Sequence, residues 1–192
     1  MGIPKIDTGP MTVDEFYAFA DVRPDEEKWE LIDGEAVLNA APSNFHQVIL
    51  KNLVVALTIE ERRRGAVWRT IPGIGALVSR TSRPEPDVMI LPKGPSRGEQ
   101  PIRDTADATV LFEIMSPSTA NRDLKWKRTA YTSLPALTHY IVIAQDAVDV
   151  VVFARDADFA EQRFKSLRDV IEISGLGISL PLSEIYYEVD FA

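Results

Sequence analysis

The sequence predicts a mixed α/β fold, with a central mixed β-sheet flanked by helices and an additional N-terminal helix and β-hairpin. Three observations predict it: residues 29–38 have the pattern of a β-hairpin, residues 43–65 have the period of a long helix, and residues 109–144 read as strand, helix and strand. At 192 residues the chain is little longer than the roughly 150 residues of an average domain. We therefore expect a single domain over residues 1–192, with its core at about residues 29–155.

The N-terminal part of the chain carries a helix signal and then a hairpin signal. Thr12 and Glu15 are spaced as a capping box, which predicts a short helix that starts near residue 13. Two four-residue strands are then predicted on either side of Asp33-Gly34, the residue pair that best accepts the positive φ angles of a two-residue hairpin turn.

The longest helix is predicted after Ser43, a residue suited to the N-cap position. Apolar side chains recur at helical spacing at Phe45, Ile49, Leu53, Ala56 and Leu57. The basic run Arg62–Arg64 suits the negative end of the helix dipole, and Gly65 suits the position just past the last turn.

The rest of the chain alternates short strands with one further helix. Strands are predicted at residues 66–71, 74–79, 87–91, 109–115, 139–144 and 148–153, with a surface loop at 92–107 and a helix at about 120–133. The strand–helix–strand succession implies a right-handed crossover. Residues 161–192 predict two short strands and a last helical turn at 183–185.

The composition excludes several classes of site. The chain has no cysteine and two histidines, so structural zinc, iron–sulfur clusters, disulfides and thiol nucleophiles are excluded. Any metal must be bound mainly by oxygen atoms, which favours a hard cation such as magnesium. The net charge of −8 argues against a surface that binds nucleic acid everywhere, but it permits a local basic cleft.

Other classes are excluded by missing motifs. The chain has no phosphate-binding loop, complete dinucleotide-binding motif, serine-hydrolase elbow or zinc-protease motif. Residues 1–6 contain no apolar signal core, and apolar runs such as 54–57 are far shorter than the ~20 residues of a membrane helix. We expect a cytoplasmic protein that does not bind membranes.

Two acids stand in unusual settings. Asp87 opens an apolar strand, and Glu113 lies inside an otherwise apolar central strand, where a carboxylate costs several kcal/mol unless a cation or donor meets it. If the two strands are neighbours, the acids lie about 5 Å apart and can share one divalent cation. Asp123, Lys127 and Tyr131 then form one polar stripe on the following helix, able to face the strand ends.

These residues carry a resemblance to a known family. The matching segments are Trp29–Glu35, His46, Pro86–Val88, Glu113–Thr119, Asp123, Lys127, Tyr131 and Tyr140–Val142. They resemble the Uma-two family of restriction-endonuclease-like proteins, within the PD-(D/E)XK nuclease superfamily, over about residues 12–188. The resemblance implies a restriction-endonuclease-like core and magnesium, with manganese as its substitute, as the cofactor.

Carried over residue by residue, Asp87 and Glu113 match the two acids of the superfamily motif. The plain pattern places a lysine two residues after the second acid, where this chain has Met115. The resemblance implies that the lysine has moved to the following helix, which matches Lys127. Lys125 is the competing lysine, and a simple ion pair between Lys127 and Asp123 is the structural alternative.

The resemblance also makes Glu35 a candidate metal ligand and His46 a candidate contact to substrate or water. Each has an ordinary structural explanation. Charged residues are common beside a hairpin turn, and a histidine in the first turn of a helix can be a passive capping contact.

Two functions of different classes remain open. The first is a magnesium-dependent DNA endonuclease with Asp87, Glu113, Lys127 and His46 as catalytic residues and Asp87, Glu113 and Glu35 as metal ligands. The second is a non-catalytic binding or assembly module on the same scaffold, favoured by the net acidity and by Met115. A DNA partner and a homodimer are expected, because such scaffolds often act as dimers on two-fold-symmetric DNA.

Overall fold

The computed structural model describes residues 10–94, 102–115 and 120–191, except for the side chains of 120–123. A six-stranded sheet has the order β10-β9-β8-β7-β5-β3. Its strands are β3 (Trp68–Pro72), β5 (Val88–Pro92), β7 (Val110–Met115), β8 (His139–Ala144), β9 (Val150–Ala154) and β10 (Glu161–Phe164). Strands β7 and β8 are parallel and the other pairs are antiparallel, which confirms the mixed sheet.

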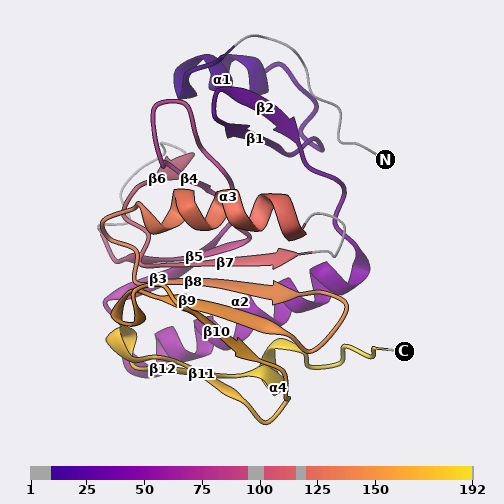
Figure 1. Ribbon diagram of the computed structural model, residues 1–192, viewed down its shortest axis with the longest axis vertical. Helices are drawn as coiled ribbons and strands as arrows, with labels where there is room; N and C mark the ends of the chain where they lie inside the picture. The colour runs from indigo at the N-terminus through magenta and orange to yellow at the C-terminus, as the bar shows by residue number, and fades with distance from the viewer. Residues whose placement is uncertain (1–9, 95–101, 116–119, 192) are drawn as a thin grey trace.

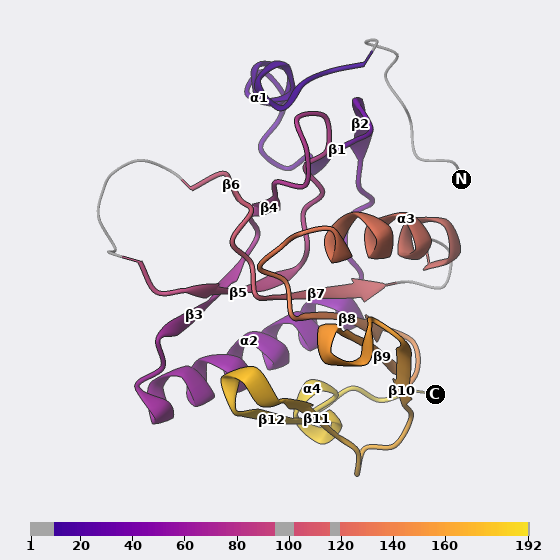
Figure 2. The same ribbon diagram turned by 60° about the vertical axis from the view of Figure 1, so that its left-hand side comes forward.

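Helices cover both faces of this sheet. Helix α2 (Asn44–Arg64) lies on one face and α3 (Ala120–Thr132) on the other, as Figures 1 and 2 show. Side chains of β7 alternate between the faces: Phe112 packs in the α2 layer, and Leu111 packs in the α3 layer beside Tyr131. Glu113 has the parity of Leu111, so its carboxylate is directed to the α3 side.

A small N-terminal layer lies on the α3 side of the sheet (Figure 1). It contains α1 (Val13–Ala20), the hairpin of β1 (Trp29–Ile32) and β2 (Glu35–Leu38), and the pair β4 (Gly75–Ala76) and β6 (Asp104–Thr105). The Thr12 capping box forms, and Asp33 and Gly34 take the positive φ angles, +49° and +83°, that the hairpin turn requires. These two predictions are confirmed.

The C-terminal segment covers the outer side of α2. Strands β11 (Val170–Ile173) and β12 (Ile178–Pro181) form a hairpin that is followed by α4 (Leu182–Ile185), with short 3₁₀ turns η1 (Arg155–Ala157) and η2 (Ser174–Leu176). The Asn52 side chain of α2 donates hydrogen bonds to the carbonyls of Ile185 and Tyr187. A buried amide thereby ties this segment to the central helix.

The long helix is confirmed with both of its caps, because the Ser43 side chain accepts from the His46 N–H and Gly65 has φ +56°. The strand predicted at 74–79 is wrong. Its regular part is Gly75–Ala76, which pairs in parallel with β6, inside the segment predicted as a loop. After β4 the chain turns back on itself at Ser79 and Ser82.

The C-terminal prediction also needs correction, because residues 161–181 contain three strands, β10, β11 and β12, instead of two. Strand β10 has three exposed residues out of four, so it lacks the apolar alternation that reveals a strand in a sequence. The helical turn after β12 lies at Leu182–Ile185, close to its predicted position. Within the described residues, no helix has both the length and the apolar character that crossing a bilayer requires.

Candidate active site

Strand register brings Asp87 and Glu113 together. Strands β5 and β7 are antiparallel with Val88 opposite Phe112, and the Asp87 N–H donates to the Phe112 carbonyl at 3.0 Å. Continuing this register by one residue places Asp87 opposite Glu113. The expectation that the two acidic strands are neighbours is therefore confirmed.

The Asp87 carboxylate is fixed at both of its oxygens. Its Oδ2 accepts a hydrogen bond of 2.7 Å from the backbone N–H of Ile114, and its Oδ1 lies 3.1 Å from Nε2 of His46. His46 is in the first turn of α2, and its own N–H is held by the Ser43 cap. Its Nδ1 is buried without a hydrogen-bond partner among the described residues. The structure thus places His46 beside the first acid.

The Glu113 carboxylate is buried under α3. Its Oε1 accepts from Nζ of Lys127 at 2.9 Å and from the Tyr131 hydroxyl at 2.7 Å. Burial raises the pKa of Glu113 to about 8; the Lys127 charge opposes this shift, and the charges of Asp87 and Glu30 add to it. Both donors end on one oxygen, so among the described residues Oε2 is the oxygen left for another ligand.

Lys127 reaches the acids from the buried side of α3, and its residue is 8% exposed. Besides Glu113, its Nζ contacts Oε1 of Glu30 at 3.0 Å. Burial alone lowers the pKa of Lys127, but the charges of Glu113 and Glu30 more than offset it and hold the pKa well above its usual value. The ammonium therefore stays charged inside the protein.

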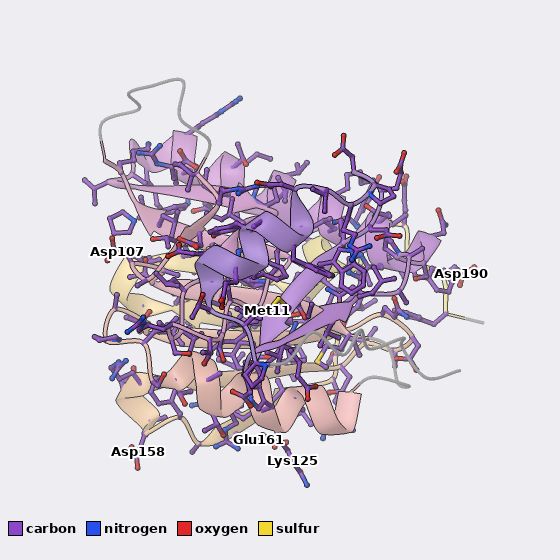
Figure 3. The ribbon with its side chains drawn as sticks, turned by 90° about the horizontal axis from the view of Figure 1, so that it is seen from above. Met11, Asp107, Lys125, Asp158, Glu161 and Asp190 are labelled. Atoms are coloured by element: carbon purple, nitrogen blue, oxygen red, sulfur yellow. The ribbon has the colours of Figure 1, made fainter. Side chains whose placement is uncertain are left out.

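The competing lysine lies elsewhere. Lys125 is exposed, and Figure 3 shows its side chain pointing away from the sheet on the outer side of α3. The alternative ion pair between Lys127 and Asp123 involves the Asp123 side chain, which lies outside the described part of the structure. The two contacts of Lys127 with Glu113 and Glu30 account for its burial without that pair.

Sequence reasoning missed Glu30. This residue of β1 is 2% exposed, and its Oε1 accepts from the Glu85 N–H at 2.7 Å as well as from Lys127. The sequence signal is ambiguous: Glu30 stands between the apolar residues Trp29 and Leu31, which fits either a buried acid or one polar face of a hairpin strand. Glu35 is exposed at the start of β2 and is not among the residues that line the cavity described next.

A cavity of about 310 Å³ opens over these groups. Its polar lining includes Glu30, Glu85, Asp87, Glu113, Lys127, His46, Lys28, Asn39, Ser43 and Gln145. Apolar residues complete it: Ala40, Ala41, Pro42, Leu50, Pro72, Pro86, Ile114 and Met115, with Gly73. One face of the cavity therefore combines carboxylate oxygens with a buried ammonium.

The donor set fits a hard divalent cation. No group of three or more His, Asp or Glu side chains in the described part of the chain is arranged as a metal centre. Magnesium does not need one, because it commonly binds one or two carboxylates and completes its shell with water and substrate phosphate. Asp87 and Glu113 supply such a pair, and the clustered acids outnumber the single ammonium of Lys127.

Comparisons with known proteins agree with the fold described above. A solved structure titled as a nuclease ("putative nuclease belonging to DUF820") from Anabaena variabilis aligns with a TM-score of 0.75 at 15% identity, covering 92% of this chain and 98% of that one. At that identity the likeness shows the fold, a mixed α/β fold shared with that protein. No curated protein matches the chain. Residues 13–183 match the Uma2 family, described as "Putative restriction endonuclease", and the chain therefore belongs to this family.

Proposed function

We propose that the protein is a metal-dependent DNA endonuclease of the PD-(D/E)XK type, with Asp87, Glu113 and Lys127 as its catalytic residues. The observation that carries the proposal is the contact of 2.9 Å between the Lys127 ammonium and the Glu113 carboxylate, on the strand next to Asp87. The buried lysine of α3 therefore contacts Glu113 of the central strand, and Asp87 lies beside it. Two acids and one lysine form the charge pattern that phosphodiester hydrolysis uses.

The chain's own groups have distinct tasks in this proposal. Hydrolysis forms one bond from a water oxygen to phosphorus and breaks one ester bond, and one proton goes to the leaving oxygen. Lys127 stabilises the negative charge that develops on the phosphoryl oxygens. His46 holds Oδ1 of Asp87 and lines the cavity, where its ring can contact the substrate or the attacking water.

Asp87 and Glu113 would hold the cation, and Glu30 would serve as a positioning residue for Lys127. Glu35, the third ligand that the resemblance implies, is exposed and does not line the cavity. Magnesium is the expected cation and manganese its substitute. When bound, the cation would lower the pKa of a water molecule and neutralise charge on the phosphate.

Cleavage of plasmid DNA tests the proposal. The purified chain with magnesium or manganese should nick or cut the plasmid, and Asp87→Asn and Glu113→Gln should each reduce the rate by about a hundredfold or more. Glu35→Gln is the matched control and should retain activity, because Glu35 is exposed outside the cavity. Cleavage that persists in both Asp87→Asn and Glu113→Gln would refute the site.

A binding or assembly module remains the second candidate, because Lys127 already satisfies Glu113 and Glu30 without a metal. Thermal unfolding separates the two functions. A rise in melting temperature with millimolar magnesium that Glu113→Gln abolishes supports the enzyme, and no rise supports the module. The homodimer is part of the proposal for either function, and light scattering after size-exclusion chromatography tests it.

A further inference from the structure

The cavity over Asp87 and Glu113 is small for a nucleic-acid site. Its volume of about 310 Å³ lies near the lower limit of the roughly 300–1,000 Å³ of small-molecule pockets. The groups at its base are nearly buried, since the side chains of Lys127 and Glu113 are 10% and 7% exposed. A phosphodiester group that reaches them must leave most of the surrounding nucleic acid outside the cavity.

The walls of the cavity suit an exposed base. Six of its lining residues have sizeable apolar side chains: Pro42, Leu50, Pro72, Pro86, Ile114 and Met115. In a duplex the faces of the bases are stacked inside the helix and cannot touch such walls. An unpaired nucleotide exposes those faces and gains free energy when apolar side chains cover them.

The charges of the lining do not suit a long duplex. A protein that binds duplex DNA usually neutralises several phosphates with Lys and Arg side chains. Of the described residues that line the cavity, the lysines are Lys28 and Lys127, and the second is already paired with Glu30 and Glu113. The acid Glu85 adds to the negative side of the lining. The described lining therefore suits about one phosphate group and contains no track of basic side chains.

We infer that the substrate of this site is DNA with unpaired nucleotides, and that an intact duplex is a poor substrate. This inference rests on the proposed phosphodiester hydrolysis. One nucleotide enters the cavity with its phosphate toward Asp87, Glu113 and Lys127 and its base against the apolar wall that includes Leu50.

Two forms of one DNA sequence test this inference. Circular single-stranded DNA and the relaxed, closed circular duplex of the same sequence are incubated with the purified chain and magnesium or manganese. The single-stranded circle should be cut about tenfold faster or more. A duplex rate equal to or above the single-strand rate would overturn the inference and leave the proposed nuclease intact. No cleavage of either form would overturn both.

A binding measurement without metal tests whether the apolar wall of the cavity contacts an unpaired base. Fluorescence anisotropy of a short labelled strand, compared with a hairpin duplex of the same composition, should show tighter binding of the single strand. Leu50→Ala should weaken that binding about fivefold and leave duplex binding unchanged. Val55→Ala is the control, because Val55 of α2 is 52% exposed and does not line the cavity. Equal single-strand affinity in the Leu50→Ala and wild-type proteins would contradict the proposed role of the wall.

Discussion

Replacement of Lys127 by methionine isolates the energetics of the buried charge cluster. The change removes the ammonium that lies 2.9 Å from Glu113 and 3.0 Å from Glu30 and keeps a side chain of similar length. Removing one partner of a buried ion pair typically costs about 3–5 kcal/mol, because the remaining charge has no partner. We expect a loss in this range at pH 8, measured by urea denaturation followed by tryptophan fluorescence.

The cost of Lys127→Met should depend on pH. Burial raises the pKa of Glu113 to about 8 in the wild-type protein, and the Lys127 charge opposes this shift, so the pKa of Glu113 should rise further in the folded variant. Near pH 8 the folded variant then binds more of this proton than the folded wild-type protein does, so its stability falls more steeply as pH rises, and the loss should be smaller at pH 5 than at pH 8. Combining Lys127→Met with Glu113→Gln should recover part of the stability.

The matched control for this experiment is Lys125→Met, which changes an exposed lysine on the same helix. A surface substitution of this kind should alter the free energy of unfolding by no more than about 0.5 kcal/mol. If Lys127→Met costs no more than Lys125→Met, the ion pairs of Lys127 do not form as described, and the electrostatic argument for the site is refuted.

Three further outcomes are expected. Tyr131→Phe removes the hydroxyl that donates to Glu113 and should lower the free energy of unfolding by about 1–3 kcal/mol in urea denaturation, and an unchanged value would exclude that hydrogen bond. Gly75→Ala places a Cβ in steric conflict with Nε of buried Arg83 and should cost about 1–3 kcal/mol in the same assay. Its control is Gly175→Ala, where no atom of the described residues lies within 4 Å of the added Cβ. The magnesium-induced rise in melting temperature should increase from pH 6 to about pH 8, because burial raises the pKa of Glu113 to about 8 and the metal must displace its proton. A rise in melting temperature that does not depend on pH would exclude Glu113 as a ligand.

Local chemistry explains why much of the fold was predictable. The hairpin around Asp33-Gly34 and the helix between Ser43 and Gly65 are specified by caps and turns that act within a few residues. Strand β4 was predicted too long because its conformation depends on distant contacts. Gly75 packs against the side chain of Arg83 and pairs with β6, and neither contact leaves a pattern in the local sequence.

The candidate site also contains residues that the sequence indicates and one that it does not. Glu113 was recognisable because an acid interrupts an apolar strand, and Asp87 because it opens the neighbouring one. Glu30 was missed because alternation along a hairpin strand allows one face to be polar, so Trp29-Glu30-Leu31 also suits an exposed acid. The N-terminal layer lies on the α3 side of the sheet, and this arrangement buries Glu30, whose burial the alternation pattern does not determine.

The position of Lys127 explains how a lysine reaches the two acids when the central strand itself contains none. A residue at position 115 has the parity of Glu113 and lies about 7 Å further along the strand; Met115 packs there in the apolar layer with Leu111 and Tyr131. The ammonium instead enters from α3, where two acids on different strands, Glu113 and Glu30, hold it. The lysine is thus fixed by the packing of the helix on the sheet and by the N-terminal hairpin together, which makes the hairpin part of the site.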